Sequence, residues 1–110
     1  MAVTNFGSIV LDDGGVGGAA ATPLTGVKLY TQTITPASVG AATVAEQTFT
    51  VTGLTTADTV VVCPAAISNA TGIAGARVSA ADTLAVRFVN PTAGALTPTA
   101  GTWRILAFRN

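Results

Sequence analysis

The chain has no histidine, and its only cysteine is Cys63. The common zinc sites, Ser-His-Asp triads and Cys-His nucleophilic pairs all require residues that this sequence lacks. With one cysteine, no disulfide can form within the chain. Cys63 follows three valines in a strand-like run. This position predicts a buried thiol that serves as a small hydrophobic side chain.

Charged side chains are also scarce, at 9% of the sequence, against about 25% in an ordinary soluble domain. Five Lys and Arg residues balance five Asp and Glu residues, so the formal net charge is zero. The cations are scattered along the chain, whereas binding to nucleic acid through its phosphates needs clustered Lys and Arg. We therefore expect no nucleic-acid partner.

The few carboxylates form no recognisable catalytic or metal-binding pattern. Asp12 and Asp13 are adjacent, but a calcium site needs about six to eight oxygen ligands, and the next acidic residue is Glu46. The other acids are Asp58 and Asp82, and two carboxylates are what glycoside hydrolysis requires. Glu46, Asp58 and Asp82 each sit in a turn-like context, where a bond to a backbone amide or an Arg partner accounts for the residue. The sequence thus predicts no enzymatic activity, no cofactor and no metal.

Long hydrophobic runs are missing, although hydrophobic residues make up 49% of the chain. The longest run, residues 60–67, contains Pro64 and is far shorter than the roughly 20 residues that cross a bilayer. We expect no membrane partner. With so few charges, the surface must consist largely of Thr, Ser, Gly and Ala. Such a surface packs against a similar one at little desolvation cost, which indicates a part of an assembly.

The first 26 residues differ in composition from the rest, and we assign them to an N-terminal arm that precedes a domain spanning residues 27–110. Four glycines between residues 14 and 18 make a helix unfavourable there. We expect an extended arm that is ordered by contact with a neighbour, and a disordered terminus is the alternative. The candidate contact residues of the arm are Phe6, Ile9, Val10 and Leu11.

Short alternating runs separated by Gly, Pro, Asn and Asp indicate β-strands throughout the domain. A set of about seven short strands is expected, including residues 27–35, 47–53, 59–63, 72–78, 83–89 and 102–109. The Ala-rich connection 36–46 allows a helical turn, and residues 79–82 form a four-residue hairpin loop. The pattern predicts an all-β fold, either an antiparallel β-sandwich or a jelly-roll-like barrel.

Two of these runs are apolar on both faces, whereas an antiparallel sheet normally leaves one face in water. In the last run, Trp103, Ile105 and Ala107 alternate with Arg104, Leu106 and Phe108. Burial of Leu106 and Phe108 would contribute roughly 3–6 kcal/mol. It requires a cover, either a loop of the same chain or a second subunit. We favour the subunit, because the chain is short and its loops are poor in apolar residues. The candidate interface residues are Trp103, Arg104, Leu106 and Phe108.

The aromatic residues raise one alternative, a stacking platform for sugars. Its members would be Phe49, Phe88, Trp103 and Phe108. Their alternation along strands favours packing in a core or an interface. A small carbohydrate-binding module therefore stays as an alternative function.

The stretch from Phe49 onward resembles small β-modules in the virion proteins of tailed bacteriophages. The resemblance is carried by FTVTGLTTADTVVV (49–62) and ARVSAADTLAVRFVNPTAGALTPTAGTWRILAFR (76–109). It implies a β-sandwich without enzymatic activity, usually a homotrimer. The small size of the chain favours a capsid decoration (cement) protein over a tail or tail-fibre, receptor-binding component.

This resemblance also implies partners and a location. The expected partners are sister copies and the major capsid protein, which the arm residues Phe6, Ile9, Val10 and Leu11 would contact. The expected location is the capsid surface of the virion, after synthesis in the host cytoplasm.

Overall fold

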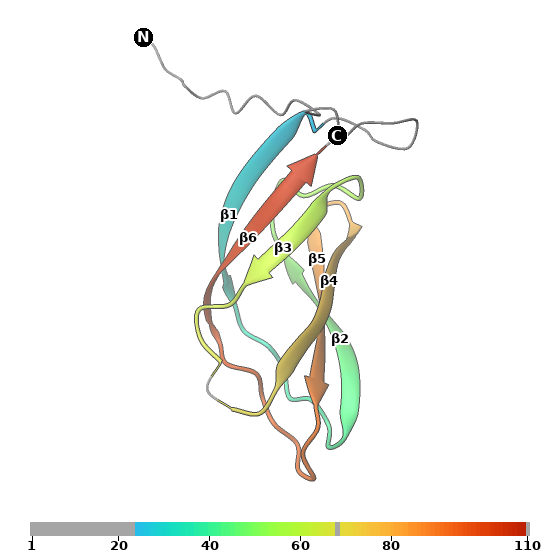
Figure 1. Cartoon of the computed structure of the whole chain (residues 1–110), viewed down its shortest axis with the longest axis vertical. Helices are drawn as coiled ribbons and strands as arrows, with labels where there is room; N and C mark the ends of the chain where they lie inside the picture. Colours follow the sequence, from blue (N-terminus) through green and yellow to red (C-terminus); the bar gives the residue numbers. More distant parts are fainter. Residues whose placement is uncertain (1–23, 68, 110) are drawn as a thin grey trace, which may run out of the picture.

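The computed structural model describes residues 24–67 and 69–109, which fold into six β-strands (Figure 1). The strands are β1 (Gly26–Ile34), β2 (Thr43–Thr50), β3 (Thr59–Cys63), β4 (Gly72–Ala80), β5 (Thr83–Asn90) and β6 (Gly101–Arg109). They form two three-stranded sheets, ordered β1-β6-β3 and β2-β5-β4, in which all neighbours are antiparallel. The prediction of an antiparallel β-sandwich is confirmed. The predicted arm lies almost wholly outside the described residues.

The chain alternates between the two sheets along most of its length. Four of the five connections between consecutive strands pass from one sheet to the other, and only β4 and β5 form a hairpin within a sheet. As a result β6, the last described strand, lies between β1 and β3. Because both edges of β6 are paired, the side chains that it directs away from the core have neighbours on two sides.

The core lies between the sheets, where the inward side chains of β5 and β6 meet. The ring of Phe88 packs edge-on against Phe49, with centroids 6.4 Å apart, and against Trp103 at 6.0 Å. The buried cluster consists of Ile34, Val39, Val51, Leu54, Val78, Leu84, Val86, Phe88, Trp103, Ile105 and Ala107. Because Phe88 and Trp103 are buried in it, the four aromatic residues do not form a common stacking surface.

The connection between β1 and β2 is more extended than the sequence predicts. Residues 36–42 form an irregular connection and no helical turn, and β2 begins earlier than the predicted start at residue 47. The side-chain amide of Gln47 donates to the Ala37 carbonyl oxygen at 2.9 Å and accepts the Ala37 N–H at 2.8 Å. These two bonds hold the connection alongside β2 in an open conformation.

The β4–β5 hairpin turns over two residues, Ala81 and Asp82, instead of the predicted four. Asp82 has a φ of 59°, a left-handed conformation that Asp tolerates better than most residues. Its Oδ1 accepts the N–H of Gly53 at 2.8 Å. The hairpin is thereby tied to the connection between β2 and β3.

At the other end of the sandwich, the buried side chain of Asn90 organises the connections around it. Its Nδ2 donates to the carbonyl oxygens of Val39, Gly40 and Gly94, at 3.0, 3.1 and 2.9 Å. Its Oδ1 accepts the N–H of Thr92 at 3.0 Å. One amide therefore links the β1–β2 connection to the β5–β6 connection. These bonds also give the buried polar atoms of Asn90 the hydrogen-bond partners that buried polar groups need.

Candidate interaction surface

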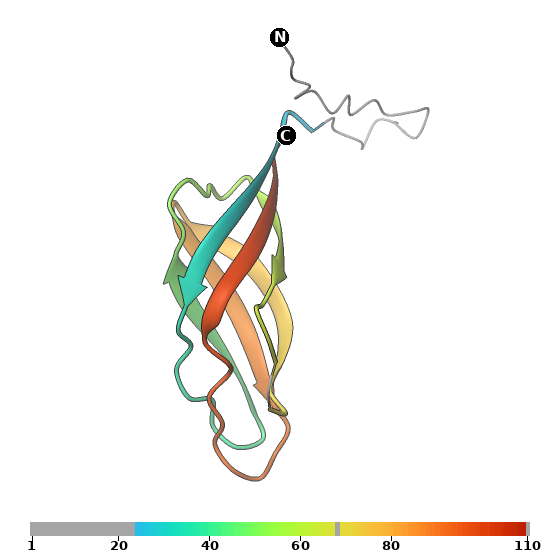
Figure 2. The same cartoon turned by 90° about the vertical axis from the view of Figure 1, so that its left-hand side faces the viewer.

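Figure 2 shows the outer side of the β1-β6-β3 sheet, with β1 and β6 nearest the viewer. Apolar side chains gather on this side of the sheet. The strand register aligns the outward-facing residues in three rows across the sheet. From the Arg109 end, the rows are Val27–Phe108–Thr59, Leu29–Leu106–Val61 and Thr31–Arg104–Cys63. We call these residues the apolar face.

Much of the apolar face is open to solvent. Leu29 is 62% exposed and Val61 is 56% exposed, while Leu106 between them is half-buried. Phe108 is also half-buried. Exposure this large on both sides of Leu106 means that no loop of the described chain covers the middle row.

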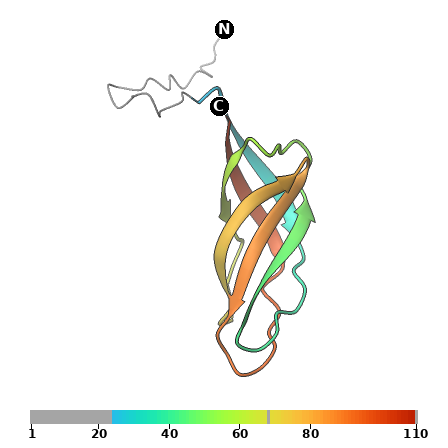
Figure 3. The same ribbon diagram turned by 90° about the vertical axis from the view of Figure 1, so that its right-hand side faces the viewer.

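The outer side of the other sheet has a different character, and Figure 3 shows it with β4 and β5 in front. Thr48, Glu46 and Arg87 face outward there, together with Arg77. Arg77 donates to both Glu46 carboxylate oxygens, from Nε at 3.0 Å and from Nη2 at 2.9 Å. The middle row of this outer side is charged, although Val44 pairs with Val89 beside it and is 53% exposed. The β1-β6-β3 sheet differs in that its middle row is wholly apolar.

Three of the four candidate interface residues lie on the apolar face, and one does not. Arg104, Leu106 and Phe108 share the outward side of β6, as their alternation predicts. Trp103 points the opposite way and is 1% exposed. Its assignment to a surface contact is therefore wrong, because the odd-numbered residues of β6 face β5 across the core. The arm candidates Phe6, Ile9, Val10 and Leu11 lie outside the described residues.

The prediction of a buried Cys63 is also wrong, since its side chain is exposed. The reason is register: Cys63 pairs with Arg104 and so takes the outward side of β3. Sequence reasoning also missed Leu29 and Val61 as members of the surface. The available signal was the second apolar side of the valine run, together with the alternation of Val27 and Leu29.

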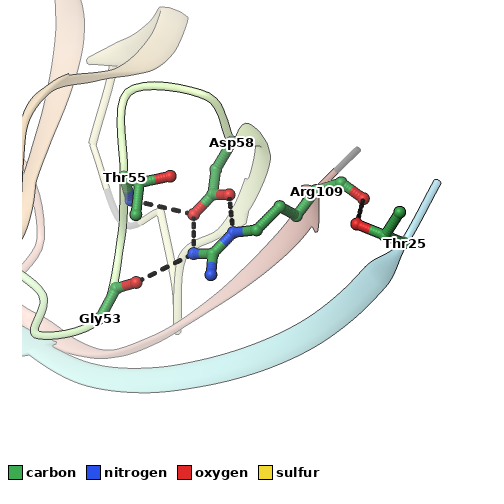
Figure 4. A network of polar contacts seen from close by, with 5 residues as sticks. All are labelled: Thr25, Gly53, Thr55, Asp58 and Arg109. Carbon is green, nitrogen blue, oxygen red and sulfur yellow. Dashed lines mark hydrogen bonds and ion pairs between the residues drawn. The ribbon is translucent and has the colours of Figure 1, made fainter. Parts of the chain in front are cut away.

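A polar network closes the end of the sheet next to the apolar face (Figure 4). The Asp58 side chain is fully buried just before β3, and Arg109 ends β6. Arg109 Nε donates to Asp58 Oδ1 at 2.6 Å, and Nη2 donates to Oδ2 at 2.8 Å. The same Nη2 donates to the carbonyl oxygen of Gly53 at 3.1 Å, and Asp58 Oδ2 accepts the N–H of Thr55 at 3.0 Å. The ion pair thus joins β6 to the β2–β3 connection.

The network makes the stability of the fold depend on acid pH. The hydrogen bonds from Arg109 lower the pKa of Asp58 from its ordinary value of 3.8 to about 2. The pair therefore stabilises the fold fully above pH 3.8, and this contribution is lost as the pH falls through about 2. We expect Asp58→Asn to lower the free energy of unfolding by about 1–2 kcal/mol at pH 7. This value is less than the pKa shift alone implies, because solvent reaches Arg109 and screens the ion pair. Urea denaturation between pH 7 and pH 2 measures it.

The exposed ion pair on the other sheet provides a matched control. The hydrogen bond from Arg77 also lowers the pKa of Glu46, but the Arg77 side chain is 62% exposed. Solvent screens such a pair, so Glu46→Gln is expected to change stability much less than Asp58→Asn. Equal losses from the two variants at pH 7 would contradict the structural role assigned to Asp58.

Metal sites, membrane-spanning helices and unpartnered acidic side chains can each be looked for among the described residues. In residues 24–67 and 69–109, no three His, Cys, Asp or Glu side chains gather as a metal site would need. No helix there has the length and hydrophobicity to cross a membrane. Each of the three described acids has a hydrogen-bond partner: Glu46 pairs with Arg77, Asp58 with Arg109, and Asp82 accepts the Gly53 N–H. The partners of Asp58 and Asp82 agree with the structural explanation that the sequence gives. Glu46 has the expected Arg partner, but its predicted turn-like context is wrong, because it lies within β2.

Comparison of the chain with family models, with curated proteins and with solved structures gives no match. The apolar face and its register across β1, β6 and β3 are the features of the described residues that bear on function.

Proposed function

We propose that this chain is a structural protein of a phage virion, a capsid decoration protein that acts as a homotrimer and carries no enzymatic activity. The observation that carries the proposal is the apolar face, an uncovered row of Leu and Val side chains across a complete sheet. The resemblance of residues 49–62 and 76–109 to phage virion modules supports the same assignment.

Physical chemistry supports self-association through this face. A sheet that exposes Leu29 and Val61 to water gains free energy when a partner covers them, at about 25 cal/mol for each Å² of apolar surface buried. In a closed symmetric assembly every copy is covered in the same way, so no apolar row remains exposed. A trimer also presents several identical contacts to a protein shell, and this multivalency makes weak individual contacts effective together.

A charge placed on the apolar face tests self-association. We expect Leu29→Asp to shift the protein from trimer to monomer, because assembly would desolvate the new carboxylate. The matched control is Val44→Asp, since Val44 is 53% exposed on β2 and lies on the outer side of the other sheet. Both residues are on strands with a free edge, so their effects on folding should be similar. Native mass spectrometry at micromolar concentration gives the oligomeric state, and a monomeric parent protein would refute the proposed assembly.

Location on the virion is the second test. Labelled protein added to purified phage heads and to purified tails, followed by negative-stain microscopy, distinguishes the decoration protein from a tail component. Binding to heads agrees with the proposal, and binding to tails alone replaces it with a tail or receptor-binding role. Absence of binding to either would refute a place in the virion.

A further inference from the structure

We propose that residues 6–11 of one copy lie along the apolar face of the next copy in the trimer. This inference rests on the proposed self-association and names the segment that covers the face. It differs from the sequence-based expectation, in which the same residues contact the capsid protein. Four apolar side chains, Phe6, Ile9, Val10 and Leu11, belong to this segment.

The place where the described chain begins supports the assignment. The Thr25 N–H and hydroxyl both donate to the carbonyl oxygen of Arg109, at 2.6 and 3.3 Å. The chain therefore enters β1 beside the first row of the apolar face, Val27–Phe108–Thr59. Residues 1–23 precede this point in the sequence, so the segment 6–11 is connected to the described chain at the Arg109 end of the sheet.

The length of the intervening chain is sufficient. Twelve residues, 12–23, separate the segment from Leu24. Fully extended, they span up to about 40 Å, whereas the nine-residue strand β6 is about 30 Å long. The segment can therefore reach the face of an adjacent copy whose sheet end lies next to its own.

Charge complementarity fixes the direction in which the segment would lie. Asp12 and Asp13 follow Leu11 directly, and they are the only charged side chains before Lys28. The cation of the apolar face is Arg104, in the third row. When the segment runs along the strands with its apolar side chains over the first two rows, the two carboxylates come to lie over Arg104 in the third row. Leu11 then lies near Cys63, which is paired with Arg104 on the neighbouring strand.

The exchange also explains how a trimer closes. Each copy gives one segment and receives one, which is a head-to-tail contact that forms a ring when the rotation between copies is one third of a turn. Every apolar face is then covered, and every segment has a site. The protein would assemble through its N-terminal residues, while its sandwich body folds separately.

Cys63 allows a direct test, because it is the only cysteine and its thiol is exposed on the apolar face. In the full-length chain, we introduce Leu11→Cys and oxidise the trimer under mild conditions. The expected products on a non-reducing gel are covalent dimers and trimers, and these should disappear when Cys63→Ser is added. The matched control is Val16→Cys, placed in the spacer, which should crosslink to Cys63 more slowly. A disulfide formed mainly within one chain would overturn the inference, because the segment would then cover its own face.

Deletion of residues 2–12 separates this inference from the proposed function. The deletion removes no described residue, so the sandwich should still unfold cooperatively in urea, with a midpoint lowered only by the lost association, while the trimer dissociates to monomers in native mass spectrometry. A trimer that survives the deletion but is abolished by Leu29→Asp would overturn the inference and leave the proposed function standing, with the sheets in contact face to face. A parent protein that is monomeric would overturn both.

Discussion

Replacement of Trp103 by alanine is expected to cost about 3–5 kcal/mol of folding free energy. The indole is 1% exposed between the sheets, and it packs edge-on against Phe88 at a centroid distance of 6.0 Å. Removal of the ring leaves a cavity that the rigid sheets on either side cannot close. Urea denaturation followed by circular dichroism measures the loss. The effect should be on stability alone, since Trp103 does not reach the apolar face.

The control for Trp103 is a phenylalanine. The indole N–H of Trp103 has no hydrogen-bond partner among the described residues, so Trp103→Phe removes a buried unsatisfied donor together with some volume. These two effects oppose each other, and the net loss should be less than about 2 kcal/mol. If Trp103→Ala left stability unchanged and instead dissociated the trimer, the residue would belong to an interface and its place in the core would be contradicted.

The second large effect is expected at Asn90. Asn90→Asp replaces an amide that donates to three carbonyl oxygens with a carboxylate that can only repel them. One carboxylate oxygen keeps the N–H and hydroxyl donors of Thr92, but the charge has no counter-ion there among the described residues. A buried charge left without its counter-ion costs about 3–5 kcal/mol, and we expect a loss of this size at pH 7. Burial raises the pKa of the introduced carboxyl, because it disfavours the ionised form. The loss should therefore shrink at pH 4 and grow toward pH 7, as measured by urea denaturation at each pH.

Asn69 offers a matched control in the same type of turn. Its Oδ1 accepts the N–H of Thr71 at 3.0 Å, two residues ahead, as Asn90 does with Thr92. Its Nδ2 donates to one carbonyl oxygen, that of Thr97 at 2.8 Å, and its side chain is half-buried. Asn69→Asp should therefore cost only about 1 kcal/mol, with little dependence on pH. Similar losses at the two positions would contradict the special role of Asn90.

Strands with regular alternation could be predicted from the sequence, and those bounded by tertiary contacts could not. Residues 83–89 and 102–109 fall within β5 and β6, because each strand has one fully inward set of large apolar residues. The early start of β2 at Thr43 follows from its pairing with Asn90 at the end of β5, and no local pattern reveals such pairing. The end of β4 depends on Asp82 in a left-handed conformation, which shortens the hairpin loop.

The candidate surface was predictable along β6 but not across the sheet. Alternation alone separates Leu106 and Phe108 from Trp103, because side chains on a strand point to opposite faces in turn. The outward direction of Leu29 follows from its pairing with Leu106, and sequence alternation does not determine pairing. The same register places Cys63 in solvent. Asp58 and Arg109 are 51 positions apart in the sequence. Patterns of neighbouring residues do not predict a pair at this separation.

The place of β6 in the topology has a consequence for biosynthesis. During translation β1 and β3 emerge first, yet the strand that pairs with both is made last of the described strands. Until it leaves the ribosome, the nascent chain holds two unpaired strands, while β4 and β5 can already close their local hairpin. Folding is therefore dominated by contacts distant in sequence, which makes β-sandwiches slow to form. The apolar face lies on this sheet, so contacts through it can form only after β6 has been made and has paired with β1 and β3.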